Sequence, residues 1–168
     1  MSKTIADVLQ NKSGIRLDIA CGANKQGPDW VGIDIQKLPG VDIIHDIETY
    51  PWPLPDECVL TSIASHIVEH INPAKFGFIN EIWRITKPGG QLAIATPYAE
   101  SLGYFQDPTH VNPCNEVTWS YFDPEDVRTG GQLYKIYQPK PWKIVHCTYS
   151  RVGQLEVILE KRAEGKHV

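Results

Sequence analysis

Five short apolar runs constrain the fold of this chain more than any other feature. They occupy residues 15–20, 30–35, 41–47, 59–65 and 91–96. Gly, Pro, Asn or Asp bounds each run, which is typical of strands buried on both faces of a parallel sheet. Before the last run, Asn72 and Pro73 predict the start of a helix that continues to Thr86 and ends at residues 87–90, Lys-Pro-Gly-Gly.

The C-terminal part follows a different pattern. Residues 142–149 and 154–161 are two strand-like runs joined by a turn that contains Gly153, and they predict an antiparallel hairpin. Parallel units followed by a hairpin indicate an α/β fold: a Rossmann-like, doubly wound, mostly parallel sheet with an antiparallel edge. We expect a single domain over residues 1–168. Its parts would be a core (15–97), a substrate or lid loop (97–141) and the hairpin.

Composition limits the partners of this domain. The chain has 168 residues and a net charge of −4, which argues against non-specific nucleic-acid binding, because that depends on an excess of Lys and Arg. No leader-like segment or membrane-length apolar run is present, so we expect a cytoplasmic protein without membrane contact. The four cysteines form no close pair, which favours free thiols: Cys21, Cys58, Cys114 and Cys147.

The turn after the first run is the expected ligand site, because such sheets bind ligands beyond the carboxyl ends of their strands. Gly22 and Gly27 have the spacing of a phosphate-binding loop, but Pro28 and Asp29 stand where Lys and Ser or Thr are required. A dinucleotide fingerprint needs three glycines before a helix, and one is present. This glycine count disfavours an NAD(P)-dependent oxidoreductase, which stays as an alternative function.

Five segments, in order, resemble the motifs of class I S-adenosylmethionine-dependent methyltransferases of the small, type 11-like kind. They are Leu17-Asp18-Ile19-Ala20-Cys21-Gly22, Val31-Gly32-Ile33-Asp34-Ile35, His45-Asp46-Ile47-Glu48, Ser65-His66-Ile67-Val68-Glu69-His70 and Ile85-Thr86-Lys87-Pro88-Gly89-Gly90. The resemblance covers roughly residues 15–97. It implies the cofactor S-adenosylmethionine and methyl transfer to an acceptor, a small molecule or a protein.

The resemblance implies a cofactor site along four strand ends. Its residues would be Asp18, Ala20, Cys21, Gly22, Ala23, Asn24, Asp34, Ile35, Asp46, Ile47, Ser65 and His66. A carboxylate at Asp34 can accept from both ribose hydroxyls, and Gly22 lets the backbone approach the ligand. By the resemblance, Asp18 lies near the methionine end and Asp46 accepts from the adenine amino group, with Ile47 on the ring. Alternatively, Asp34 and Asp46 only end strands in turns.

The connection between the first two strands departs from the family pattern. Residues 21–29 are too few for a crossover helix, which takes at least about 10–12 residues, and Gly27-Pro28 interrupts them. We expect the first helix to be reduced or absent. This departure keeps a second alternative open, a non-catalytic adaptor that binds S-adenosylmethionine and acts through a partner.

Residues 66–70 match the H-x-x-E-H pattern of inverted zinc metallopeptidases. That chemistry requires both histidines on one helix, whereas His66 falls at the end of a predicted strand. No third ligand is evident in the sequence. We therefore expect no metal, and the resemblance instead assigns the backbone at Ser65 and His66 to the sulfonium pocket.

The loop after the fifth run holds the candidate catalytic residues. Methyl transfer depends mainly on proximity and alignment, and a neutral histidine can also take a proton from the acceptor. His110 is the first candidate, oriented by Asp107, and His66 is the second. Alternatively, Asp107 and His110 hold the loop through local hydrogen bonds. The aromatic residues around them would then be either lid core or a substrate cage.

Overall fold

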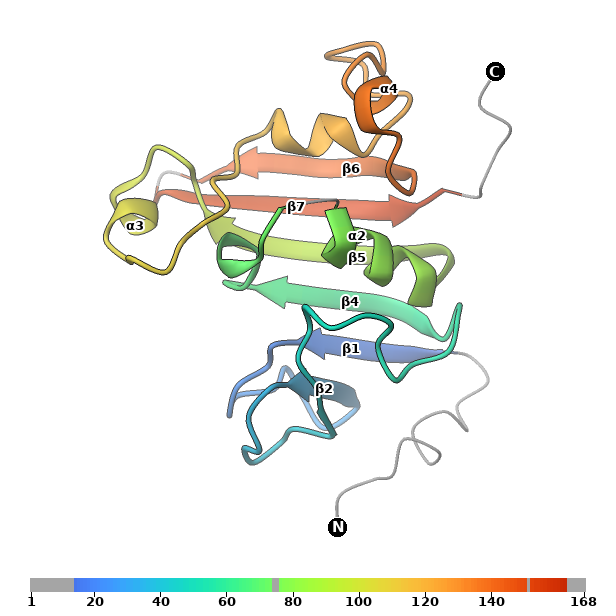
Figure 1. Cartoon of the computed structure of the whole chain (residues 1–168), viewed down its shortest axis with the longest axis vertical. Helices are drawn as coiled ribbons and strands as arrows, with labels where there is room; N and C mark the ends of the chain where they lie inside the picture. The colour runs from blue at the N-terminus through green and yellow to red at the C-terminus, as the bar shows by residue number, and fades with distance from the viewer. Residues whose placement is uncertain (1–13, 74–75, 151, 163–168) are drawn as a thin grey trace.

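The computed structural model describes residues 14–73, 76–150 and 152–162, which form one sheet with the strand order β3-β2-β1-β4-β5-β7-β6 (Figure 1). The strands are β1 (Ile15–Ile19), β2 (Trp30–Asp34), β3 (Ile43–Ile44), β4 (Val59–Ser65), β5 (Thr86–Pro97), β6 (Trp142–Tyr149) and β7 (Gln154–Lys161). β1 to β5 are parallel, whereas β7 is antiparallel to both β5 and β6. The predicted Rossmann-like sheet with its C-terminal hairpin is confirmed.

The strand bounds agree with the sequence prediction where apolar alternation is clear. β4, β6 and β7 have the predicted bounds, and β1 and β2 each end one residue earlier. β3 is much shorter than the predicted 41–47. One turn closes before it, where the Val41 amide donates to the Leu38 carbonyl, and another begins after it at Asp46. β5 is longer than predicted, because the chain enters it directly from the preceding helix.

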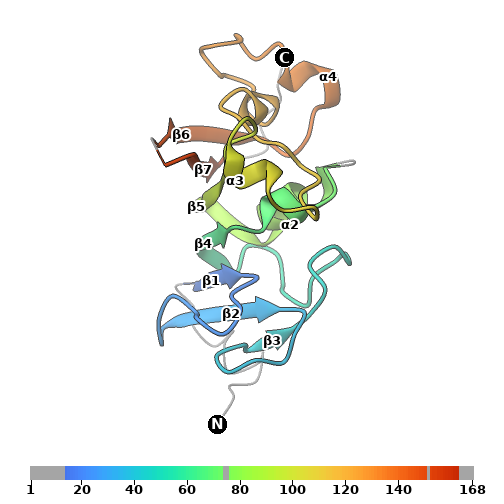
Figure 2. The same cartoon turned by 90° about the vertical axis from the view of Figure 1, so that its left-hand side faces the viewer.

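Helix α2 (Gly77–Ile85) covers one face of the sheet at β4 and β5, as Figures 1 and 2 show. Its start at Asn72 and Pro73 was predicted wrongly. Phe76 precedes the helix in a left-handed conformation (φ 54°) without a side-chain cap. The residues that face the core are Phe78, Ile79, Ile82, Trp83 and Ile85. None of the described helices is long and apolar enough to span a membrane.

Polar contacts, rather than a helix, hold the connection from β1 to β2. Residues 20–29 are all described and contain no helix, which confirms that the first helix is reduced. The Asp18 carboxylate accepts from the Gln26 amide at 2.8 Å. Lys25 Nζ lies 2.6 Å from Asp42 Oδ2, and the same oxygen accepts from the Gly32 amide at 2.8 Å. These bonds tie the connection to the following strands.

Residues 98–141 form an irregular layer with three short helices: α3 (Leu102–Phe105), η3 (Thr118–Tyr121) and α4 (Tyr134–Tyr137). α3 and the loop after it lie at the carboxyl ends of β4 and β5, on the left of Figure 1. The Val111 and Asn112 amides donate to the Glu69 carbonyl, which fixes this loop to η1 (Val68–His70). Cys114 is fully buried and forms a backbone bridge with Tyr98.

Candidate cofactor and active site

The turn after β1 crosses the end of β2. Ala20 and Gly22 both adopt left-handed conformations, with φ of 55° and 54°. The Cys21 amide donates to the Ile33 carbonyl at 3.3 Å, which holds the turn against the neighbouring strand. A Cβ atom built on Gly22 would meet nothing within 4 Å. Gly22 therefore serves the turn through its backbone conformation, and the space beside it is open.

Asp34 connects this turn to the end of β2. One carboxylate oxygen accepts from the Gly22 amide and the other from the Gln36 amide, both at 2.9 Å. A carboxylate oxygen has two lone pairs, so each can accept a further bond from a hydroxyl group. Ala23 and Asn24 are exposed beside the turn. Asp34 therefore fixes the turn and still presents acceptors at the strand edge.

Asp18 lies behind the turn and is only 4% exposed. Burial raises the pKa of its carboxyl group, and the Gln26 amide and Lys25 act in the opposite direction. Burial, together with Asp18 and Asp34, also raises the pKa of the Cys21 thiol to about 11. Cys21 is therefore protonated at neutral pH and a poor nucleophile.

Two residues predicted to contact adenine have local structural roles. Asp46 Oδ1 accepts from the Glu48 amide at 3.0 Å, which forms a turn after β3. The Ile47 side chain lies in the core, and its carbonyl accepts from Trp52 Nε1 at 3.0 Å. Ile35 differs, since 63% of it is exposed directly after Asp34. Ile35 is thus an exposed apolar side chain at this edge, and so is Ile44 on β3, which is 56% exposed and pairs with Asp34.

A cavity of about 320 Å³ lies at the ends of β4 and β5. Its walls include the three predicted catalytic residues, His66, Asp107 and His110, together with Glu69 and His70. The structure therefore brings two distant segments of the chain together, one after β4 and one after α3. Ser65 lies at the end of β4, directly before His66.

Asp107 does not orient His110 in the predicted way. Its Oδ2 lies 3.8 Å from His110 Nε2, which is too far for a hydrogen bond. Asp107 instead accepts from the Thr109 hydroxyl at 2.7 Å and from the Thr109 amide at 2.8 Å. These bonds hold the pKa of the Asp107 carboxyl group below its usual value. The local turn that the sequence offered as an alternative is what the structure contains.

The two candidate histidines differ in exposure. His110 is held by a 2.7 Å hydrogen bond between Nδ1 and the Tyr104 carbonyl, and its ring packs against the Tyr104 ring. His66 follows β4 in a left-handed conformation, and 55% of its side chain is exposed. Its Nδ1 lies 3.4 Å from Glu69 Oε1. His110 is therefore fixed by its surroundings, whereas His66 is accessible.

Glu69 and His70 were not predicted as site residues. Glu69 is 1% exposed, and its Oε2 accepts from the Thr96 hydroxyl at 3.0 Å. His70 packs edge-on against His110, with ring centroids 4.7 Å apart. The H-x-x-E-H pattern was the available signal. It could not show that the loop after α3 adds His110 to the same group.

A second cavity, of about 240 Å³, lies between α2 and the 98–141 layer. Aromatic side chains form much of its wall: Phe76, Phe78, Trp119, Tyr121, Phe122 and Tyr137. Val68 and Asn112 line this cavity, and their chain neighbours Glu69, His70 and His110 line the first. The two cavities are therefore separated by the same two chain segments.

Comparison with solved structures adds to this geometry. A SAM-dependent methyltransferase from Archaeoglobus fulgidus matches with a TM-score of 0.60 and 19% identity, over 93% of this chain and 89% of that one. A putative type 11 methyltransferase from Sulfolobus solfataricus matches with a TM-score of 0.53 and 19% identity, over 97% and 93%. The chain has the class I methyltransferase fold. No family model matches its sequence, and no curated protein is similar to it in sequence.

The methyltransferase fold does not by itself fix a reaction. The [4+2]-cyclase SpnF matches this chain with a TM-score of 0.60 and 15% identity, over 94% of this chain and 78% of that one. The reaction therefore depends on the residues at the strand ends.

Proposed function

We propose that the chain binds S-adenosylmethionine and transfers its methyl group to a small-molecule acceptor. The observation that carries this proposal is Asp34, which lies at the end of β2 in a methyltransferase fold and is bonded to the Gly22 turn. In this arrangement, the carboxylate that would accept from the ribose hydroxyls also holds the turn beside the cofactor. The proposal accounts for the single glycine turn, because a ligand without a pyrophosphate needs no triple-glycine cradle.

The residues at this edge fit the cofactor part by part. Asp34 would accept from the ribose hydroxyls, and exposed Ile35 would contact the adenine ring. The backbone at Ser65 and His66 would border the sulfonium. When bound, the cofactor supplies an activated methyl group. An acceptor lone pair forms the new bond to that methyl carbon while the carbon–sulfur bond breaks and its electron pair stays on sulfur.

The histidine cavity supplies a proton acceptor for acceptors that carry N–H, O–H or S–H groups. His66 and His110 both line it. His110 donates from Nδ1 to the Tyr104 carbonyl, so its Nε2 is the nitrogen with a free lone pair. His66 is the more accessible of the two. The volume of the histidine cavity, about 320 Å³, supports a small-molecule acceptor.

Cofactor binding is tested with Asp34→Ala and Asp34→Asn in the full chain. S-adenosylmethionine and S-adenosylhomocysteine should raise the melting temperature of the unmodified protein, and NAD and ATP should not. Asp34→Ala should weaken cofactor binding by about 1.5–3 kcal/mol, the scale of a hydrogen bond to a charged group. Asp34→Asn, which keeps an acceptor for the Gly22 amide, should lose less. Asp29→Ala, an exposed carboxylate paired with Arg16, is the matched control.

Turnover separates the enzyme from its alternatives. A screen of acceptor classes should show S-adenosylhomocysteine formation that depends on the acceptor. Cofactor binding without turnover across all classes would favour the adaptor. Equal stabilisation by NAD would favour an oxidoreductase and overturn the proposal.

A further inference from the structure

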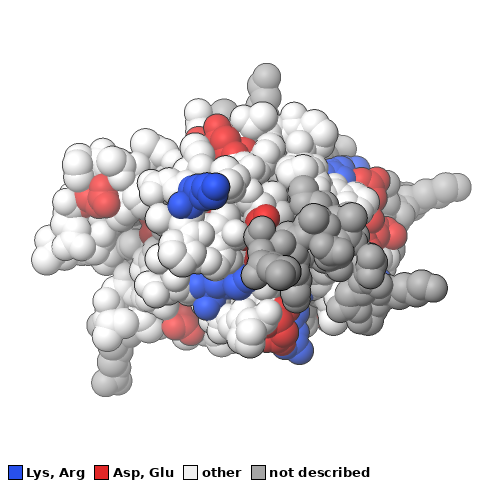
Figure 3. All heavy atoms as spheres, turned by 90° about the horizontal axis from the view of Figure 1, so that it is seen from below, with Lys and Arg blue, Asp and Glu red and all other residues white. Residues whose placement is uncertain are grey.

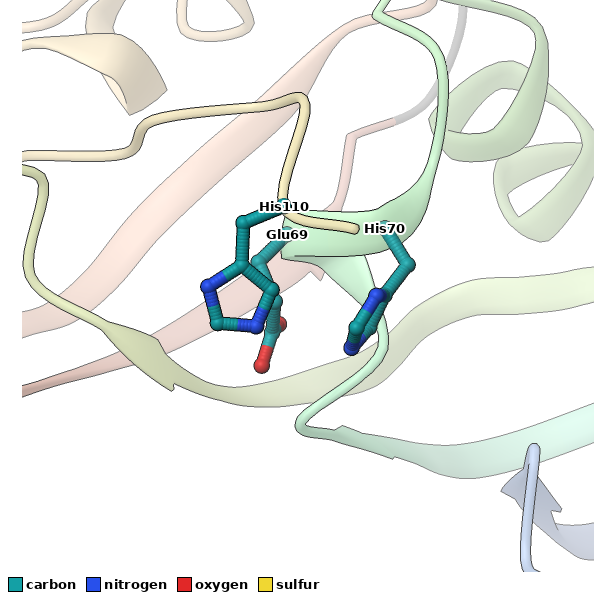
Figure 4. A group of neighbouring side chains, drawn as sticks. All are labelled: Glu69, His70 and His110. Atoms are coloured by element: carbon teal, nitrogen blue, oxygen red, sulfur yellow. The ribbon is translucent and has the colours of Figure 1, made fainter. Parts of the chain in front are cut away.

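Glu69, His70 and His110 form a compact group of possible metal ligands, shown in Figure 4. One ligand atom from each lies within 4.8 Å of the others. In a tetrahedral zinc site, ligand atoms that each lie about 2.1 Å from the ion are about 3.4 Å apart. Small side-chain rotations would therefore close this group around one ion.

Hydrogen bonds leave a coordinating nitrogen available on each histidine. His110 donates from Nδ1 to the Tyr104 carbonyl, so its Nε2 is unprotonated in the neutral ring. His70 Nδ1 lies 3.0 Å from the Thr109 hydroxyl. That hydroxyl donates to Asp107, so it accepts from His70, and Nε2 of His70 is again the unprotonated nitrogen. Outer hydrogen bonds of this kind orient histidine ligands in metal sites.

Glu69 is a buried carboxylate, and its side-chain partners among the described residues are Thr96 and His66. Thr96 donates to its Oε2, and its Oε1 faces His66 at 3.4 Å. Within the described part of the chain, no Lys or Arg forms an ion pair with Glu69. Buried charges are normally paired or bound to a metal, because removing an ion from water is costly.

The backbone keeps these side chains together without an ion. The Val111 and Asn112 amides donate to the Glu69 carbonyl at 2.8 and 3.0 Å. These bonds bring the segment that carries His110 next to the segment that carries Glu69 and His70. The ligand group is therefore built by two backbone bonds and the hydrogen bonds of its own side chains.

We propose that Glu69, His70 and His110 bind one divalent transition-metal ion, with Zn²⁺ as the best match to two imidazoles and a carboxylate. Three protein ligands leave at least one position open, and the group lines the 320 Å³ cavity. A water molecule or an acceptor oxygen can occupy that position. His110 is then a metal ligand, and His66 is the more exposed histidine of the cavity. The site rests on none of the cofactor residues of the β1 turn.

Metal titration of the chelator-treated full chain tests this site. Calorimetry with Zn²⁺ should give one ion per chain, and the ion should raise the melting temperature. His70→Ala and His110→Ala should each weaken binding by more than the 10- to 100-fold typical of losing an outer hydrogen bond. Thr96→Val removes the hydroxyl that orients Glu69, and it should weaken Zn²⁺ binding by about 10- to 100-fold.

The matched control is His146→Ala, an exposed histidine on β6 outside the cavity. It should keep full stoichiometry and affinity. Far-UV circular dichroism establishes that each variant is folded, and Glu69→Gln provides a ligand change of nearly equal size. Absence of Zn²⁺ binding, or unchanged binding in folded His70→Ala and His110→Ala, would overturn the site. Loss of the ion in His146→Ala would assign it elsewhere and overturn the site too. None of these readouts depends on methyl transfer.

Discussion

Two halves of one sheet, β1–β3 and β4–β7, are stabilised in different ways. The second half packs under α2 and the aromatic layer of residues 98–141. The first half has buried strands, but its described connections contain no helix and are held by carboxylates that accept from backbone amides.

Figure 3 shows acidic and basic side chains dispersed over one face, without a large patch of either sign among the described residues.

This difference teaches that the candidate cofactor edge and the main apolar core draw on different interactions. Hydrophobic burial scales with the apolar area removed from water and depends little on ionisation. A carboxylate that holds a turn acts through directed hydrogen bonds, so it depends on the close fit of the backbone around it. Substitutions in the two halves should therefore separate stability from cofactor binding.

Ile82→Ala should have the largest effect on stability. Ile82 is fully buried in α2, and truncating such a side chain costs about 2–5 kcal/mol. Urea unfolding should show this loss, while the cofactor affinity of the folded protein should stay nearly unchanged. Ile136→Ala, at an exposed position in α4, is the control and should change little. An equal loss of cofactor affinity in Ile82→Ala would mean that the two halves are not separable.

Gly32→Ala should damage both stability and binding. A Cβ there would lie 2.6 Å from Cys21 Sγ and 2.9 Å from the Gly40 carbonyl oxygen. Overpacking of this kind costs about 1–3 kcal/mol, and Cys21 belongs to the β1 turn of the proposed cofactor site. Gly27→Ala, whose new Cβ would meet its nearest neighbour at 3.4 Å, should be tolerated. Full cofactor affinity in Gly32→Ala would show that the turn can move without consequence.

Two buried carboxylates should respond to pH in opposite directions. Burial would raise the pKa of Asp126, but Thr129, Ser120 and Arg128 outweigh it and lower that pKa. Ionised Asp126 therefore stabilises the fold above about pH 4, and this stabilisation is lost as the pH falls through the lowered pKa. The pKa of Asp18 is raised, so pH has the opposite effect there. Ionisation of Asp18 lowers the stability of the fold as the pH rises above about 4.

Urea unfolding at pH 7 and pH 3 measures this contrast. Asp126→Asn should cost about 1 kcal/mol at pH 7 and less at pH 3. Asp18→Asn keeps an acceptor for the Gln26 amide and should be as stable as the unmodified protein, or more stable, at pH 7. Destabilisation by Asp18→Asn at pH 7 would show that its charge supports the first half.

Ala20→Gly should have the smallest effect. Ala20 has a φ of 55°, which costs an L-residue about 1–2 kcal/mol, whereas glycine adds about 0.5–1 kcal/mol of unfolded-state entropy. The net result should be a gain of between 0 and about 1.5 kcal/mol in the free energy of unfolding. Ala93→Gly, within β5, should instead lose about 0.5–1 kcal/mol. A loss of stability in Ala20→Gly would mean that the alanine methyl group has a packing role.

The sequence predicts the parts of the fold that local patterns determine. β4 and the hairpin strands were predicted with their correct bounds, because apolar residues and turn residues mark both ends. The start of α2 was not predicted correctly, because Phe76 precedes the helix in a left-handed conformation without a side-chain cap. β3 was overestimated because turns on both sides use residues that also suit strands.

The candidate site likewise has one part that the sequence predicts and one part that it does not. Parallel strands place their carboxyl ends at one edge, so the position of Asp34 beside the β1 turn follows from topology. The contact between Glu69 and His110 does not, because it joins segments that approach only when the loop after α3 bonds to η1. The burial of Glu69 is also a tertiary effect, since the short segment around it has no periodic pattern.

The cysteines give each half of the sheet its own chemical reporter. Burial raises the pKa of Cys114 to about 12, and that of Cys21 in the first half is about 11. Because the thiolate is the species that reacts with alkylating reagents, both thiols should react slowly at neutral pH, and local opening should speed the reaction of half-buried Cys21 and of fully buried Cys114. Peptide mass spectrometry after timed alkylation would then follow the opening of the β1 turn and of the β5 side separately. The unmodified chain can thus report which half opens first.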